Sequence, residues 1–126
     1  MKVVKQTISF LEGNTKETIN SLKKSMWEAS KSQSYEKAAS LYLAAAENGL
    51  VESQVNLGVV FVKGEISVQN YIQAHMWFNI AASQGNIAAR DYRDNIAKQM
   101  VPQDISTAQQ LAQSCVLQNY IGCSPL

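Results

Sequence analysis

The chain repeats itself at a spacing of 36 residues, and this periodicity limits the possible fold more than any other feature of the sequence. Tyr35, for example, recurs 36 positions later as Tyr71. Repetition at a fixed period of 20–50 residues is typical of proteins built from stacked structural repeats, which present extended surfaces to partners. The identical pairs at this spacing include Gln33 and Gln69, Tyr35 and Tyr71, Ala38 and Ala74, Ala45 and Ala81, Ala46 and Ala82, and Gly49 and Gly85.

The repeating segments have the apolar periodicity of helices. Small and apolar side chains recur every three or four positions over residues 38–46 and again over 74–82, which indicates one buried face of a helix. No stretch shows the sustained two-residue alternation of a strand. Gly49 and Gly85 follow these segments, where a glycine can adopt the left-handed conformation that ends a helix. The sequence therefore predicts an all-α fold made of αα-hairpins.

Extending the pattern in both directions predicts a short right-handed solenoid of about three repeats. Leu22, Met26 and Trp27 match Leu57, Phe61 and Val62 at a spacing of 35 residues, which places an earlier helix at about 15–30. A last helix is expected to begin at Pro102, because proline suits the first turn. One αα unit cannot bury its apolar face alone, so three is about the minimum for stability. The predicted segments are an N-terminal extension over 1–14, repeats over about 15–48, 51–84 and 87–118, and a C-terminal tail over 119–126.

Charge and hydropathy exclude several classes of protein. A net charge of +1 on 126 residues lacks the clustered basic face that nucleic-acid binding requires. The longest apolar stretch, Val55–Val62, is interrupted by Asn56 and is far shorter than a membrane span. Residues 1–12 contain no continuous apolar core of a signal peptide. We therefore expect no membrane span and a cytoplasmic location for the chain as given, or an exported protein if a leader has been removed.

The segment from Tyr71 to Asn86 resembles the second helix and glycine exit of a Sel-one-like repeat, a relative of the tetratricopeptide αα solenoids. Ser53-Gln54, Leu57-Gly58 and Gly64 are similar to the first helix and loop of that family, and residues 93–112 look like the unit that often closes such arrays in bacterial proteins. The resemblance extends over about 33–115. The chain departs from the family pattern at three places. Ile66 stands where a second loop glycine is common, and Ser30–Ser32 replace both loop glycines in the first unit. Val101 stands where a capping Thr or Ser is common.

The resemblance implies a non-catalytic adaptor or scaffold, without a cofactor, that holds a protein or peptide segment on its concave face. Around the packing stripe of Leu57 and Phe61, the free positions of the middle unit are Asn56, Val60 and Lys63, which are the candidate groove residues. Arg93 belongs to a mixed-charge cluster with Arg90, Asp91 and Asp94. This cluster suits either an exposed helix face with an Arg90–Asp94 pair or a charged part of the groove.

No arrangement of residues indicates catalysis or metal binding. His75 is the single histidine, and no group of further ligands surrounds it at metal-binding spacing. We expect it to be structural, and Trp27 and Trp77 to be core residues. A Cys115–His75 nucleophile pair would lack an orienting third group. The sequence therefore predicts no enzyme activity, no metal and no cofactor.

Cys115 and Cys123 are separated by seven residues, and Gly122 allows the chain to reverse between them. Cysteine-rich relatives of the family place disulfides across an αα turn at a similar spacing, so a disulfide and two free thiols are both open. A disulfide would indicate an oxidising, periplasmic or exported setting. Those relatives also suggest alternative functions, small-ligand binding or hydrolysis. A further alternative is a structural module, a monomer or weak dimer, that associates through Val51–Val62 or the tail.

Overall fold

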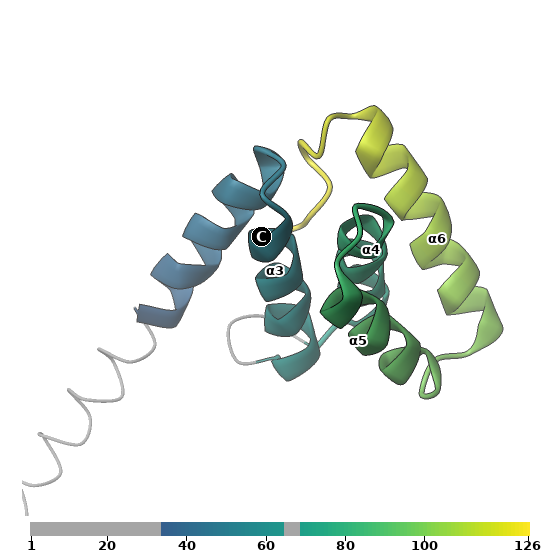
Figure 1. The fold of residues 1–126 in the computed structure, drawn as a ribbon. Helices are drawn as coiled ribbons and strands as arrows, with labels where there is room; N and C mark the ends of the chain where they lie inside the picture. Colours follow the sequence, from purple (N-terminus) through teal and green to yellow (C-terminus); the bar gives the residue numbers. More distant parts are fainter. Residues whose placement is uncertain (1–33, 65–68) are drawn as a thin grey trace, which may run out of the picture. The chain divides into compact units, whose positions relative to one another are not determined.

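The computed structural model describes residues 34–64 and 69–126. The chain divides into Met1–Ser34, of which Ser34 alone is described, and the compact unit Tyr35–Leu126, to which the following description refers. The helices of the described residues extend over 34–47, Val51–Lys63 (α3), Tyr71–Ser83 (α4), Ile87–Ala97 (α5) and Pro102–Leu117 (α6) (Figure 1). No strand occurs in the described residues, and the predicted all-α class is confirmed. The predicted N-terminal extension, the helix at about 15–30 with Trp27, and Ile66 lie outside the described residues.

The two glycine exits have the predicted conformation and share one hydrogen-bonding pattern. Gly49 and Gly85 have φ values of 88° and 95°. The amide of Gly49 donates to the carbonyl of Ala46 at 3.0 Å, and the next amide donates to Ala45 at 3.1 Å. The same two bonds recur 36 residues later, from Gly85 to Ala82 at 3.0 Å and from the next amide to Ala81 at 3.2 Å. Both exits therefore form a Schellman motif, which satisfies the last carbonyls of each helix.

The helix starts follow local side-chain chemistry. Asn70 accepts a hydrogen bond from the Gln73 amide at 3.1 Å and begins α4, while Asn86 does the same for Ala89 at 2.8 Å and begins α5. Asparagine oxygens at this position satisfy amides that have no partner within the helix. Val101 supplies no side-chain cap to α6, which begins at Pro102 as predicted.

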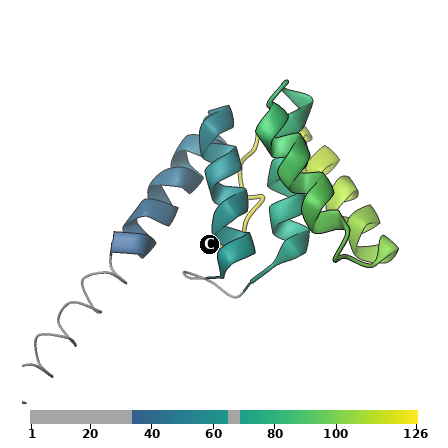
Figure 2. The ribbon, with the colours of Figure 1, turned by 60° about the horizontal axis from the view of Figure 1, so that its bottom comes forward.

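Helix α4 is the centre of the core. It packs against α3, α5 and α6 (Figures 1 and 2), and its residues Trp77, Phe78 and Ala81 are buried, which confirms the prediction for Trp77. Gly58 brings α3 close to the Phe78 ring. A Cβ atom added at Gly58 would lie 2.6 Å from Cδ1 of Phe78, so no larger residue fits there without a shift of the ring.

A buried glutamine joins the two helix exits, and the sequence interpretation missed it. Gln54 of α3 is fully buried. Its Nε2 donates to the carbonyl of Ala46 at 3.2 Å, and its Oε1 accepts a hydrogen bond from Nε2 of Gln84 at 2.8 Å. Because a buried amide without partners is costly, these bonds fix how α3 sits against the ends of helix 34–47 and α4.

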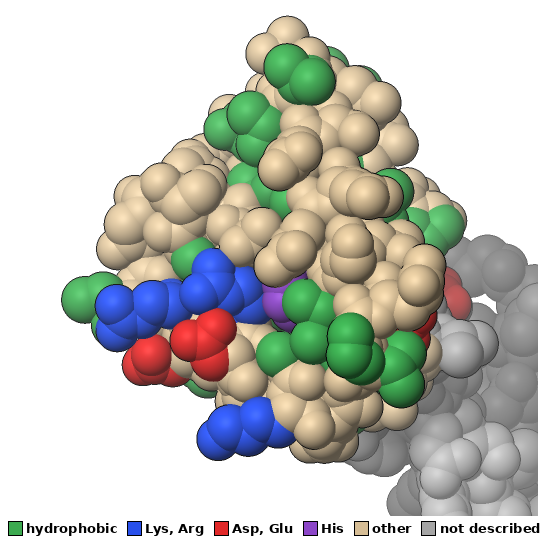
Figure 3. Space-filling view, turned by 90° about the vertical axis from the view of Figure 1, so that its right-hand side faces the viewer, with side chains coloured by type: hydrophobic (Ala, Val, Ile, Leu, Met, Phe, Trp, Pro, Cys, Tyr) green, Lys and Arg blue, Asp and Glu red, His purple; other side chains and the backbone are tan. Residues whose placement is uncertain are grey.

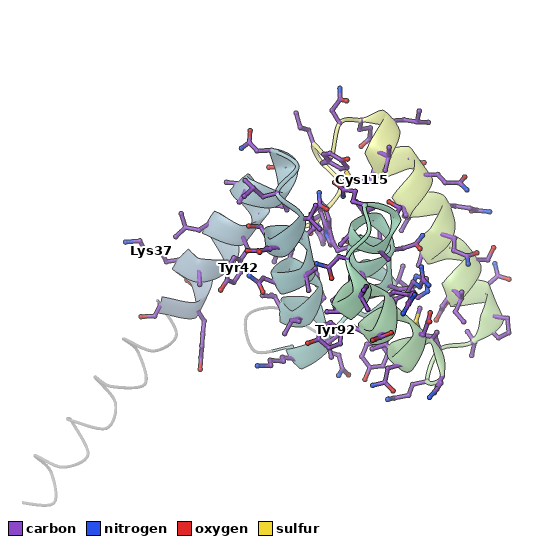
Figure 4. All side chains as sticks on the ribbon, viewed as in Figure 1. Lys37, Tyr42, Tyr92 and Cys115 are labelled. Carbon is purple, nitrogen blue, oxygen red and sulfur yellow. A yellow bond between two sulfur atoms is a disulfide. The ribbon has the colours of Figure 1, made fainter. Side chains whose placement is uncertain are left out.

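The C-terminal tail returns to the end of helix 34–47 (Figure 1). A disulfide joins buried Cys115 to Cys123, and Cys115 is labelled in Figure 4. The Gly122 amide donates to a carboxylate oxygen of Glu47 at 3.0 Å. The ring of Tyr120 covers Gly49, where an added Cβ would lie 3.5 Å from it. The tail therefore links the last helix to the first described hairpin exit.

Candidate functional site

Three of the four predicted groove residues line one pocket. Asn56, Val60 and Lys63 of α3 face helix 34–47 across a hollow of about 280 Å³. We call it the Tyr42 pocket, after one of the two tyrosines that helix 34–47 contributes to it (Figure 4). The other lining residues are Tyr35, Ala38 and Val59.

A second pocket lies on the other side of α3, toward α5. It has a volume of about 390 Å³, and we call it the Tyr92 pocket. Phe78 and Tyr92 form its aromatic part, with ring centroids 5.5 Å apart and an interplanar angle of 52°. The other lining residues are Val59, Val62, Lys63, Asn95 and Ile96. Since Val59 and Lys63 line both pockets, the two hollows form one surface around α3, which we call the α3 face.

The α3 face is largely uncharged. Lys63, in the last turn of α3, is the one charged side chain among the residues that line either pocket. It is exposed, and within residues 34–64 and 69–126 it has no ion-pair partner. Its ammonium group is therefore available to an anionic group of a binding partner.

The structure places Arg93, the fourth predicted groove residue, apart from this surface. Its Nη1 donates to Oδ1 of Asn79 at 2.8 Å, and its Nε lies 3.0 Å from Oδ1 of Asp94. Figure 3 shows the neighbouring basic and acidic side chains on the side of the molecule that carries α6.

The ion pairs in this cluster join chain neighbours. Arg90 contacts Asp91 at 3.6 Å, whereas the sequence interpretation paired it with Asp94. The reason is that Asp94 is engaged by Arg93, whose guanidinium group is held against α4 by Asn79. The cluster therefore has the character of an ordinary charged helix surface.

His75 lies within the packed part of α4. Its side chain is buried, and its Nδ1 has no hydrogen-bond partner. Burial lowers the pKa of His75, and the nearby positive charge of Arg93 lowers it further, while Asp94 acts in the opposite direction. The ring is therefore neutral near pH 7. Among the described residues, no group of three or more His, Cys, Asp or Glu side chains could hold a metal ion.

The geometry of Cys115 leaves it without nucleophilic chemistry in this structure. Its sulfur is bonded to that of Cys123, so it offers no thiolate, the form that acts as a nucleophile.

Of the described helices, none has the length and apolar character needed to cross a bilayer.

These helix pairs, with the same glycine exit repeated after 36 residues, define a protein of the αα-hairpin repeat class. The family model of the Sel1 repeat matches residues 29–50 and 51–86, and this part of the chain belongs to the Sel1 repeat family. Comparisons with curated proteins and with solved structures gave no match. Sel1 repeats form helical solenoids that are generally protein-interaction modules and typically non-catalytic.

Proposed function

We propose that this chain is a non-catalytic protein-interaction module that binds a segment of a partner protein on the α3 face. The observation that carries the proposal is the agreement between the helix register and the geometry. The helix register predicts that the packing stripe of α3 leaves Asn56, Val60 and Lys63 free, and these three residues line one pocket together. The general role of Sel1 repeats in protein interaction supports the same function.

The size and lining of the two pockets suit side chains of a polypeptide. Of the two volumes, about 280 Å³ lies just below the range for small-molecule sites and about 390 Å³ lies near its lower end. Tyr42, Phe78 and Tyr92 provide aromatic surface, and aromatic residues are enriched where protein interfaces gain most of their binding energy. Two adjacent hollows, each of a size for one or two side chains, fit a segment better than a compact ligand.

The disulfide supports an oxidising compartment for this interaction. Cys115 and Cys123 are both engaged in it, and such bonds persist mainly in secreted or periplasmic proteins. We accordingly propose that the partner is met outside the cytoplasm.

The test is affinity capture from the native cell with the purified chain and with a variant carrying Asn56→Ala, Val60→Asp and Lys63→Glu. A matched control carries Gln109→Ala, Gln110→Ala and Gln113→Ala on exposed positions of α6. We expect a captured protein to be lost with the α3 variant, to be retained with the control, and to bind the purified chain directly in calorimetry. Equal capture by all three proteins would contradict this placement of the site.

A further inference from the structure

The two pockets of the α3 face are the same pocket built twice. Tyr42 of the first corresponds to Phe78 of the second, 36 residues later, and both are aromatic. The remaining equivalent lining positions at this spacing are Asn56 and Tyr92, Val59 and Asn95, and Val60 and Ile96. A hollow that recurs once per repeat is suited to a partner that places a side chain in each.

The separation of the pockets sets the spacing of those side chains. Helix α3 stands between the two hollows and contributes Val59 and Lys63 to both. A helix with its side chains is about 10–12 Å across, so the two anchoring side chains lie about 10 Å apart. In an extended polyproline II segment, residues three positions apart point to the same side and are about 9 Å apart.

The charge of Lys63 indicates which kind of side chain the partner places between the two that enter the pockets. Lys63 is exposed at the border of both pockets and is the one charged residue that lines them. A carboxylate that reaches its ammonium group would form a charge-assisted hydrogen bond, which is stronger than one between neutral groups. A basic residue of the partner at this point would be repelled.

We propose that the partner segment is an extended acidic peptide with two apolar side chains three residues apart and a carboxylate between them. The apolar side chains enter the Tyr42 and Tyr92 pockets, and the carboxylate pairs with Lys63. This inference rests on the proposed function, because it describes the ligand of the same face.

The experiment selects binders of the purified full chain from a library of displayed random peptides. We expect enrichment of sequences with two apolar residues at positions i and i+3 and Asp or Glu between them. Enrichment of apolar residues seven positions apart, the spacing of one helix face, or of sequences with Lys or Arg between the anchors would overturn the proposal.

Binding constants of a selected peptide and of its Glu→Gln form then test Lys63 directly. Lys63→Met should weaken binding of the acidic peptide about fivefold, the upper range for an exposed ion pair, and should abolish the difference between the two peptides. The control is Lys37→Met, at an exposed lysine of helix 34–47 that lines neither pocket (Figure 4), which should leave both constants unchanged.

The failures of the two proposals are distinguishable. If selected peptides lose affinity with Val60→Asp but show no preference for the acid, the acidic ligand is wrong and the α3 face remains the binding surface. If neither a peptide nor a captured protein depends on Val60 or Asn56, the proposed function is wrong as well.

Discussion

Replacing Gly58 by alanine tests how closely α3 packs on α4. The added methyl group would lie 2.6 Å from Cδ1 of Phe78 and 2.9 Å from its Cζ, well inside normal contact. Phe78 is only 1% exposed, so its ring has little room to move. Overpacking of this kind costs about 1–3 kcal/mol, and the severe overlap favours the upper half of that range.

The same substitution also has a stabilising effect, and the balance of the two decides the outcome. Alanine is about 1 kcal/mol more favourable than glycine within a helix. The net expectation for Gly58→Ala is a loss of about 1–2 kcal/mol in the free energy of unfolding. For a chain of this length it corresponds to a fall of roughly 4–8 °C in Tm.

Urea unfolding followed by circular dichroism measures this loss, and a double-mutant cycle identifies its cause. Phe78→Leu removes the part of the ring that the methyl group would contact. Gly58→Ala should therefore cost about 1 kcal/mol less in the Phe78→Leu background than in the natural chain, because residues in contact are coupled. A Gly58→Ala protein more stable than the natural one would show that helix propensity dominates and that the close approach of α3 to α4 is wrong.

Further expectations concern the core, the histidine and the disulfide. Ala81→Leu, at a fully buried position of α4, should lower the free energy of unfolding by about 1–3 kcal/mol, and an unchanged melting curve would refute its packing role. Because the folded pKa of His75 lies below 6.5, the unfolded chain takes up the proton first, and stability should fall as the pH is lowered through 6.5. The Tm of His75→Gln should accordingly fall less between pH 7.5 and 5.5, and an equal fall in both proteins would count against a buried neutral ring. Intact mass should rise by about 2 Da on reduction of the Cys115–Cys123 bond, whose loss in Cys123→Ser should cost about 2–3 kcal/mol, and a mass that does not change would exclude the disulfide.

Local signals in the sequence were sufficient to predict where helix 34–47 and α4 end and where α6 begins. Glycine at positions 49 and 85 specifies a left-handed exit because other residues adopt that conformation at a cost, and both glycines have it. Proline at 102 fixes the start of α6 in the same local way. These features depend on a few neighbouring residues, which is why the sequence alone predicts them.

Contacts between elements were harder to predict. The bonds of Gln54 to Ala46 and Gln84 join segments that are distant in the sequence, and a glutamine in an amphipathic helix resembles a surface residue. The hydrogen bond of Arg93 was hard to predict for the same reason. Its position on a charged helix face was clear from the sequence, but the attraction to Asn79 of α4 depends on how α4 and α5 pack.

One part of the predicted groove followed from local sequence, and the other part depends on contacts between helices. The register of α3 indicated that Asn56, Val60 and Lys63 point away from the packing stripe, and the structure brings them to one pocket. The aromatic walls, Tyr42 from the preceding helix and Tyr92 from α5, could not be assigned to the site from the helix register of α3 alone. They follow from the stacking of successive repeats.

The most direct test of the binding role is an NMR titration of the isotope-labelled chain with the captured partner or its binding segment. Binding on the α3 face predicts the largest amide shift changes at Tyr42, Asn56, Val59, Lys63 and Tyr92, with the amides of α6 little affected. Changes concentrated on α6, or none at saturating partner, would contradict the proposed site.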